Sequence, residues 1–229
     1  MNSSELEILY EDNHIIAVNK KAGQIVQGDK TEDIPISELL KIYLKEKYNK
    51  QGNVFLGVVH RLDRPVSGVV LFAKTTKALT RLNEMFKLKE AKKTYYAICG
   101  NKPPKDEDTL IYNIYRDEGK NKSFIRKKES KETKTAILRY KVINKSEKYF
   151  LLEIDLQTGR HHQIRCQLAE IGCPIKGDLK YGFLRSNPDA SISLHSAKIN
   201  FVHPIKQEPL IITAPFPKDN LWNILIENI

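Results

Sequence analysis

Short apolar runs along this chain predict strands more often than helices. The runs Leu6–Tyr10 and Ile15–Asn19 flank the turn-prone Glu11-Asp12-Asn13 and predict an opening β-hairpin. The unbroken run Val69–Ala73 predicts a strand that is buried on both faces. Similar runs predict five further strands, at Thr94–Cys99, Thr135–Ile143, Tyr149–Leu156, Leu194–Val202 and Leu210–Thr213.

Apolar residues at helical spacing, three or four positions apart, mark four amphipathic helices. The first carries a stripe from Ile36 to Leu44, and we expect Ser37 or a nearby residue to begin it. The others are expected around Ala78–Phe86, around Ile164–Ile171 and after Pro217. Because strands outnumber helices and do not alternate strictly with them, the pattern predicts an α+β fold with a largely antiparallel sheet.

Composition narrows the class of protein. A chain of 229 residues with 41% hydrophobic and 29% charged residues is long enough for one large or two small domains, and these values exclude a disordered or fibrous chain. The longest apolar run, Gly68–Ala73, is far too short to span a membrane, and the N-terminal residues lack the features of a secretion signal. Cys99, Cys166 and Cys173 form an odd, sparse set, so we expect free thiols and a cytoplasmic protein.

The formal net charge of +10 is concentrated in two segments. Lys74–Lys93 and Lys120–Lys134 each carry seven basic and two acidic residues, and the rest of the chain is neutral. Concentrated positive charge is expected on a surface that binds a polyanion such as RNA, but lysine-rich surfaces also serve solubility alone. Composition leaves both interpretations open.

The first stretch whose side chains could take part in catalysis is His60-Arg61-Leu62-Asp63-Arg64, which precedes the predicted buried strand. Neighbouring arginines favour the ionised form of Asp63, which makes it a candidate reactive carboxylate. The alternative is a turn residue that caps backbone N–H groups or pairs with Arg61.

A second stretch, Gln157–Cys166, gathers Arg160, Gln163 and Arg165 with two histidines near a predicted helix N-terminus. So many donors suit a phosphate or a carboxylate. His162 and Cys166 are four residues apart, but no complete tetrahedral ligand set accompanies them, so we expect no metal.

A third stretch, Ala91–Ile98, carries Tyr95 and Tyr96, which face opposite ways on a strand, so one can be core while the other lines a cleft. Dinucleotide-binding and Walker glycine motifs are absent from the sequence, as are a serine-nucleophile elbow and a zinc-protease motif. We therefore expect no cofactor, and any chemistry has to come from carboxylate, arginine and tyrosine side chains.

Taken together and in this order, these stretches resemble the RluA family of pseudouridine synthases over nearly the whole chain. The segments that carry the resemblance are LYEDNHIIAVNKKAG, HRLDRPVSGVVLFAKT, KKTYYAICG, TGRHHQIRCQLAEIGCPIKGDLKYG and LHSAKINFVHP. Departures such as Lys21 in place of the family's usual proline, and Val66 in place of its usual threonine, suggest a divergent subgroup.

The resemblance implies an enzyme that isomerises a uridine in rRNA or tRNA to pseudouridine without cofactor or metal. It implies that Asp63 is the catalytic aspartate, Tyr95 the active-site tyrosine and Arg165 the arginine paired with the aspartate. Asp63 would either attack ribose C1′ or assist departure of the base through a glycal, and the sequence leaves both routes open. The same motifs supply five candidate substrate-binding residues, namely His60, Arg61, Arg64, Arg160 and Gln163.

The family fold implied is a mixed, mostly antiparallel sheet in two subdomains with the active cleft between them. We expect residues 1–229 to form a single catalytic domain, monomeric and without the N-terminal S4 domain often found in the family. The segment Lys120–Lys134 is charged enough to be a flexible arm that becomes ordered on RNA. The main alternative function is a catalytically silent RNA-binding or ribosome-assembly module on the same fold; a glycoside-type hydrolase is disfavoured because no second carboxylate stands out.

Overall fold

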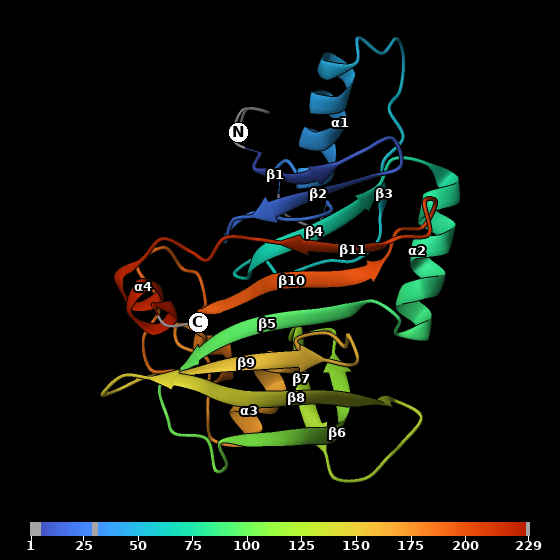
Figure 1. Ribbon diagram of the computed structural model, residues 1–229. Helices are drawn as coiled ribbons and strands as arrows, with labels where there is room; N and C mark the ends of the chain where they lie inside the picture. The colour runs from blue at the N-terminus through green and yellow to red at the C-terminus, as the bar shows by residue number, and fades with distance from the viewer. Residues whose placement is uncertain (1–5, 29–31, 228–229) are drawn as a thin grey trace. The chain divides into compact units, whose positions relative to one another are not determined.

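The computed structural model describes residues 6–28 and 32–227 and divides the chain into two compact units (Figure 1). Unit 1 consists of Met1–Ala91 and Ser196–Pro215, and unit 2 of Lys92–His195 and Phe216–Ile229. Each unit is built on antiparallel strand pairs with flanking helices, so the predicted α+β class with a mostly antiparallel sheet and two subdomains is confirmed.

Unit 1 is centred on β4, Ser67–Ala73, the strand predicted from its unbroken apolar run. It pairs antiparallel with β2, Ile15–Lys20, which in turn pairs with β1, Ile8–Glu11, as the predicted hairpin. The two-residue strand β3, Gly57–Val58, also pairs with β4. On the other side lie the two remaining strands, β10 (Leu194–Val202) and β11 (Pro209–Thr213), which pair antiparallel with each other.

A glycine is required where β4 approaches β10. Gly68 has φ of 116°, which side chains rarely tolerate, and a Cβ there would collide with the backbone of Ser196. From Gly68 onward every β4 residue is buried, because both faces of the strand are covered.

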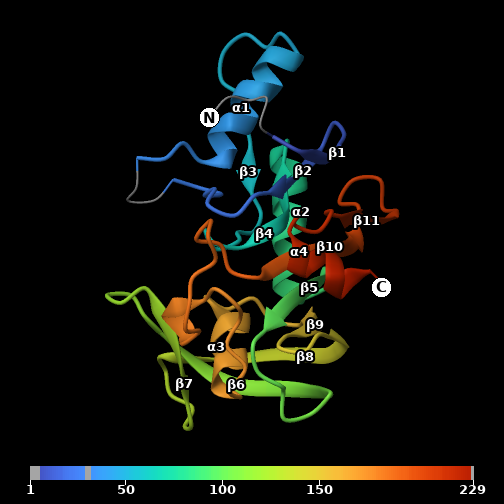
Figure 2. The same cartoon turned by 90° about the vertical axis from the view of Figure 1, so that its left-hand side faces the viewer.

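Two helices belong to unit 1. Helix α2, Thr76–Leu88, begins where the Thr75 hydroxyl accepts a hydrogen bond from the Ala78 amide, and it runs along one side of the strands (Figure 2). Helix α1, Ile36–Lys47, begins after Pro35 without any side-chain cap, so a residue near Ser37, as expected, precedes its first turn. The core beside α2 is a continuous apolar cluster of strand and helix residues that includes Ile15, Val69, Leu71, Leu82, Ile199 and Phe201.

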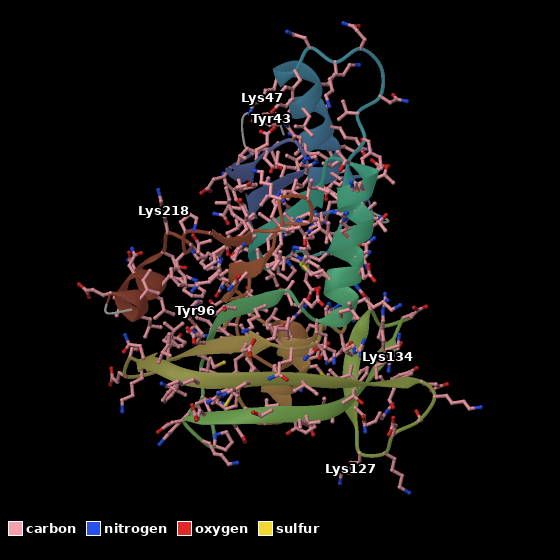
Figure 3. The ribbon with its side chains drawn as sticks, turned by 45° about the vertical axis from the view of Figure 1, so that its right-hand side comes forward. Tyr43, Lys47, Tyr96, Lys127, Lys134 and Lys218 are labelled. Carbon is pink, nitrogen blue, oxygen red and sulfur yellow. The ribbon has the colours of Figure 1, made fainter. Side chains whose placement is uncertain are left out.

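Helix α1 is tied to β1 by the carboxylate of Glu11. Four side chains donate hydrogen bonds to it: Lys74 and Tyr48 to Oε1, each at 2.7 Å, and Lys47 and Tyr43 to Oε2 at 2.7 and 3.0 Å. Tyr43 and Lys47 lie together on α1 (Figure 3). Burial acts to raise the pKa of Glu11, but the hydrogen bonds from Lys47, Lys74 and the two tyrosines outweigh burial and lower the pKa to about 2.

We expect Glu11→Gln to remove a pH-dependent contribution to the free energy of unfolding. Because the folded pKa lies below the ordinary value of 4.5, the contribution is fully present above pH 4.5 and is lost as the pH falls toward 2. At pH 7 the variant should be less stable by up to about 3 kcal/mol. Urea unfolding at pH 7 and at acid pH measures the difference.

Glu38→Gln is the matched control, because Glu38 is an exposed residue that forms an ion pair with Lys41 on the same helix. It should change stability by about 0.5 kcal/mol or less. Equal losses for the two variants at pH 7 would contradict the role given to Glu11.

Unit 2 contains five antiparallel strands in the order β5-β9-β8-β6-β7. Their bounds are Lys92–Cys99 for β5, Phe150–Leu156 for β9, Thr133–Lys145 for β8, Glu107–Asp117 for β6 and Lys122–Arg126 for β7. Helix α3, Gln163–Glu170, lies against one face of these strands (Figures 1 and 2). It is held there by the buried Gln167, whose amide nitrogen donates to the carbonyls of Leu110 and Ala136.

The C-terminal helix α4, Asn220–Ile226, packs against β8, where the Asn144 side-chain amide donates to the Leu225 carbonyl at 2.8 Å. The Asp219 carboxylate caps it by accepting from the amides of Leu221 and Trp222. The Trp222 ring then packs on Phe216, which in turn contacts Tyr96 of β5 edge to face at 5.0 Å. A 3₁₀ turn, Leu179–Tyr181, follows α3 in the chain.

Two expectations for the middle of the chain are wrong. No element was predicted between Cys99 and Thr135, yet β6 and β7 lie there. Lys120–Lys134 is not a flexible arm, because β7 and the first residues of β8 are paired strands. The reason is tertiary: the amide of Ser123 in β7 donates to the Tyr181 hydroxyl, and its own hydroxyl bonds to His161, so that contacts distant in sequence hold the strand.

None of the helices within residues 6–28 and 32–227 is long and apolar enough to cross a membrane.

Candidate active site

Asp63 lies in the loop that joins β3 to β4 in unit 1. Two buried side chains, Leu62 and Val66, anchor the loop on either side of it, and the Val66 amide closes a turn onto the Asp63 carbonyl at 3.0 Å. The Gly23 amide binds the Arg64 carbonyl at 2.8 Å and holds the loop from the opposite side. The side chain of Asp63 is half-buried, so the loop fixes a carboxylate that is only partly exposed to solvent.

The same loop is fastened by Lys20, a fully buried lysine at the end of β2. Its Nζ donates to three backbone carbonyls, those of Val66 at 2.7 Å, Arg64 at 3.0 Å and Lys21 at 3.1 Å. Burial lowers the pKa of Lys20 to about 7, while the negative charge of Asp63 acts to raise it. Three carbonyl acceptors use all three N–H groups of an ammonium, so the geometry fits the charged form. Lys20 therefore places a positive charge close enough to Asp63 to influence it electrostatically.

We expect Lys20→Met to destabilise the protein by about 2 kcal/mol, because the substitution leaves buried carbonyls of the Asp63 loop without their donor. Lys21→Met, a substitution at the exposed neighbour, is the control and should have little effect. Chemical denaturation of both variants measures the difference. Similar stabilities for the two would show that Lys20 does not hold the loop.

Three predicted substrate-binding residues flank Asp63, and the structure gives them different surroundings. His60 accepts a hydrogen bond from the Leu71 amide at its Nε2 and stacks on Phe86 at 5.2 Å, so it fastens the loop to β4 and α2. Arg64 is exposed and forms an ion pair with Asp33. Arg61 is exposed beside Asp63, and such a position suits contact with a phosphate.

Tyr95 lies on β5 in unit 2, where it pairs with Ile154 of β9 and is 6% exposed. Tyr96 faces the other way: its hydroxyl donates to Glu153 at 2.7 Å, and burial, followed by this interaction, raises its pKa. Tyr96 therefore contacts Glu153 and Phe216 on its own side of the sheet. This agrees with the expectation that the two tyrosines face opposite ways.

The turn before α3 is organised by the side chain of Gln163. Its oxygen accepts from the Thr158 hydroxyl at 2.7 Å and from the Arg160 amide at 3.0 Å, and its nitrogen donates to the Ile137 carbonyl at 3.1 Å. Gln163 is buried and these contacts shape the turn. Arg160 remains exposed, with its Nε donating to the Thr135 carbonyl, and its guanidinium lies at the surface of this turn.

Arg165 points from α3 into a buried ion pair. Its Nε and Nη2 donate to the two carboxylate oxygens of Asp178, at 2.7 and 2.9 Å, and the two residues are 5% and 1% exposed. Its guanidinium also lies 5.1 Å from the centre of the Tyr181 ring. A two-pronged pair with a stacked ring holds the guanidinium in one orientation.

Two histidines precede α3. His162 takes a left-handed backbone conformation with φ of 51°, and its Nδ1 lies 3.0 Å from the Tyr181 hydroxyl. Burial, followed by the charge of Arg165, lowers the pKa of His162 to about 2, so this imidazole is neutral. The thiol of Cys166 donates to the Ser123 carbonyl, and burial raises its pKa to about 12. Within the described residues no three His, Cys, Asp or Glu side chains form a cluster that could hold a metal.

The structure places the eight predicted site residues in two groups. His60, Arg61, Asp63 and Arg64 share one loop of unit 1, and the others, Tyr95, Arg160, Gln163 and Arg165, belong to β5 and the start of α3 in unit 2. Sequence reasoning missed Lys20 and Asp178. Both lie inside quoted motifs, NKKAG and GDLKYG, but only their burial reveals what they hold.

Comparison with known proteins gives consistent results. A family model described as RNA pseudouridylate synthase matches residues 14–170. The chain is 36% identical to the "Uncharacterized RNA pseudouridine synthase YhcT" of Bacillus subtilis, over 94% of this chain and 70% of the relative. It is 32% identical to the "tRNA pseudouridine synthase C" of Vibrio cholerae, over 96% of this chain and 94% of the relative.

A further relative, the "Ribosomal large subunit pseudouridine synthase C" of Rickettsia prowazekii, is 37% identical over 92% of this chain and 68% of its own. Among solved structures, "Human RNA Pseudouridylate Synthase Domain Containing 4" superposes with a TM-score of 0.77 at 23% identity, covering 93% of this chain and 89% of that chain. This last likeness supports the fold.

Proposed function

This chain belongs to the RNA pseudouridylate synthase family, in its RluA branch, and on that premise we propose that it converts a specific uridine of tRNA or rRNA into pseudouridine. The observation that supports the proposal best is the extent of the family match. Residues 14–170 include Asp63, Tyr95 and Arg165, and each of these lies on a well-anchored loop, strand or helix. The carboxylate, phenol and guanidinium that the reaction requires are therefore all present.

The reaction breaks the bond between ribose C1′ and uracil N1, turns the base and rejoins it through C5, with no net oxidation or reduction. We assign Asp63 the role of the carboxylate that either attacks C1′ or assists departure of the base through a glycal. Lys20 donates hydrogen bonds to three backbone carbonyls and in this way keeps the Asp63 loop in place. At the end of the reaction C5 releases its proton to solvent and N1 takes up a proton, so that the product is an isomer of the substrate.

Tyr95 and Arg165 take supporting roles in this proposal. Tyr95 stacks on the uracil ring and takes part in proton transfer during the rearrangement. Arg165 orients an anionic group with its guanidinium, and the pair with Asp178 sets the direction in which that guanidinium points. The predicted pairing of Arg165 with Asp63 stays a prediction.

A uridine inside a stacked strand has to leave the stack before its glycosidic bond is accessible. Extruding it costs about a few kcal/mol. Arg61 is exposed beside Asp63, so we assign it to contact a phosphate next to the extruded base or to fill the gap that the base leaves.

We place the protein in the cytoplasm, because its three cysteines are free, buried thiols.

The experiment that tests the function uses purified protein with transcribed tRNAs and rRNA fragments carrying tritium at uridine C5. Tritium release that accompanies pseudouridine formation is the expected result, and a pseudouridine map of RNA from cells with and without the gene identifies the site. RNA binding without tritium release on any of these RNAs would contradict the proposal and favour a silent RNA-binding or assembly module.

A further inference from the structure

One face of the β6–β7 hairpin carries aromatic and basic side chains outside the residues assigned to catalysis. Tyr115 of β6 lies directly opposite Phe124 of β7, and Asn113 lies opposite Arg126. Residues paired in this way, and those two positions along a strand, point to the same side of a sheet. We call Tyr115, Phe124 and Arg126, together with Lys120 and Lys122 beside them, the hairpin face.

Cations lie over both rings of the hairpin face. The Arg126 guanidinium is 5.2 Å from the centre of the Tyr115 ring. The Lys120 amine is 6.0 Å from the centre of the Phe124 ring, and the Lys122 amine lies between two rings, 5.4 Å from the centre of Phe124 and 5.0 Å from that of Tyr181. Tyr115 and Phe124 are half-buried, and Arg126 and Lys120 are exposed, so side chains of both kinds reach solvent on this face.

The reverse side of the same hairpin is attached to α3 and the segment that follows it. Ser123 is 1% exposed, its amide donates to the Tyr181 hydroxyl at 2.8 Å, and its carbonyl accepts from the Cys166 thiol. These contacts give β7 a fixed position. The hairpin face is therefore a preformed surface, which lowers the entropy lost when a ligand binds.

The hairpin face also points away from the catalytic tyrosine within unit 2. Directly paired residues on neighbouring strands point to the same side of the sheet. Tyr95 pairs with Ile154, Ile154 with Tyr140, and Tyr140 with Asp108, so Tyr95 and Asp108 lie on the same side. Tyr115 is an odd number of residues from Asp108 on β6, which places it on the opposite side. Figure 1 shows α3 behind these strands, with β6 and β8 in front of it.

The surrounding charge indicates the kind of partner. The segment Lys120–Lys134 carries seven basic and two acidic residues. Lys127 and Lys134 lie on either side of the turn between β7 and β8 (Figure 3). Rings flanked by cations on a positively charged surface match the bases and phosphates of single-stranded RNA, since every base has a face that stacks on an aromatic ring.

We propose that the hairpin face is a second RNA-contacting surface, which binds unpaired nucleotides of the substrate RNA at a distance from the modified uridine. Bases stack on Tyr115 and Phe124, while Arg126, Lys120 and Lys122 contact phosphates. This inference rests on the proposed function for the identity of the RNA. It goes beyond that function because it names a second surface and states that this surface binds unpaired nucleotides.

The test compares Phe124→Leu and Arg126→Ala with the wild-type protein in fluorescence anisotropy. The probes are a labelled unstructured RNA of about 20 nucleotides, longer than a typical single-strand site, and a duplex of the same length. Each variant should weaken binding of the single strand by about tenfold, because a stacked base or a ring-bound cation is lost. Binding of the duplex, whose bases already stack on one another, should change much less. Phe124→Trp restores a stacking ring and should recover the affinity.

Arg116→Ala is the matched control, because Arg116 is an exposed arginine on β6 whose side chain points to the other side of the hairpin. Unchanged single-strand affinity in Phe124→Leu, equal weakening by Arg116→Ala and Arg126→Ala, or equal loss for duplex and single strand would each overturn the proposal. Unchanged single-strand affinity in Phe124→Leu would instead favour a protein as the partner of the hairpin face.

Pseudouridine formation at saturating RNA separates this inference from the function on which it rests. The variants should retain the wild-type kcat and show a raised KM, because the hairpin face does not touch the reacting base. A fall in kcat at unchanged KM would overturn the assignment to binding. If the wild-type protein formed no pseudouridine, the proposed function would be contradicted. The anisotropy measurements would still test whether the hairpin face binds single-stranded RNA.

Discussion

Asp63→Asn should lower the rate of pseudouridine formation by on the order of 10⁴-fold or more, the scale on which removal of a reacting group acts in other enzymes. An amide oxygen carries no negative charge, so it neither attacks C1′ effectively nor stabilises a departing base. Asparagine has nearly the volume of aspartate, and the loop is held through Leu62, Val66 and Lys20, so the fold should persist. Tritium release from C5-labelled uridine measures the rate directly.

RNA affinity provides the second readout for this variant. It should stay within about threefold of the wild-type value, because phosphate contacts supply most of the affinity for RNA and Asp63 makes none. Asp106→Asn, the same chemical change at an exposed residue before β6, should leave turnover unaffected. Turnover of Asp63→Asn within tenfold of the control would show that Asp63 is not the reacting carboxylate.

Asp178→Asn should destabilise the protein by about 3 to 5 kcal/mol, because it removes the buried negative charge that accepts two hydrogen bonds from the Arg165 guanidinium. The pair is almost inaccessible to solvent, with Asp178 at 1% exposure, so water compensates poorly. Activity should fall by about a hundredfold or more even at temperatures where the variant is folded, since Arg165 loses the contact that orients it. Urea unfolding and tritium release measure the two effects separately.

A double variant separates stability from positioning. Arg165→Met combined with Asp178→Leu replaces the ion pair by apolar side chains and should recover most of the lost stability. It should remain inactive, because no guanidinium is present. Asp106→Asn, at an exposed residue before β6, serves as the control here as well. Recovery of activity in the double variant would contradict a role for Arg165 in catalysis.

Much of the fold was predictable because the relevant signals are local. The apolar run at Val69–Ala73 and the hairpin around Asp12 depend on neighbouring residues, and both match the strands observed. The segment of β6 and β7 was missed for the opposite reason. Its strands are stabilised by α3 and Tyr181, which lie about 40 to 60 residues further along the chain. Its many charged residues gave no apolar pattern from which strands could be predicted.

The order and spacing of its motifs were enough to place this chain in its family and to propose Asp63, Tyr95 and Arg165 as its catalytic residues, because those motifs contain the types of side chain that the proposed reaction needs. The tertiary structure was required to show what holds them. Lys20 and Asp178 read as ordinary charged residues in the sequence, and only their complete burial against specific carbonyls and a guanidinium identifies them as supports. Burial depends on contacts between distant segments, which no local pattern contains. The same is true of the hairpin face, where a stretch that reads as a run of lysines becomes a pair of rings with cations above them.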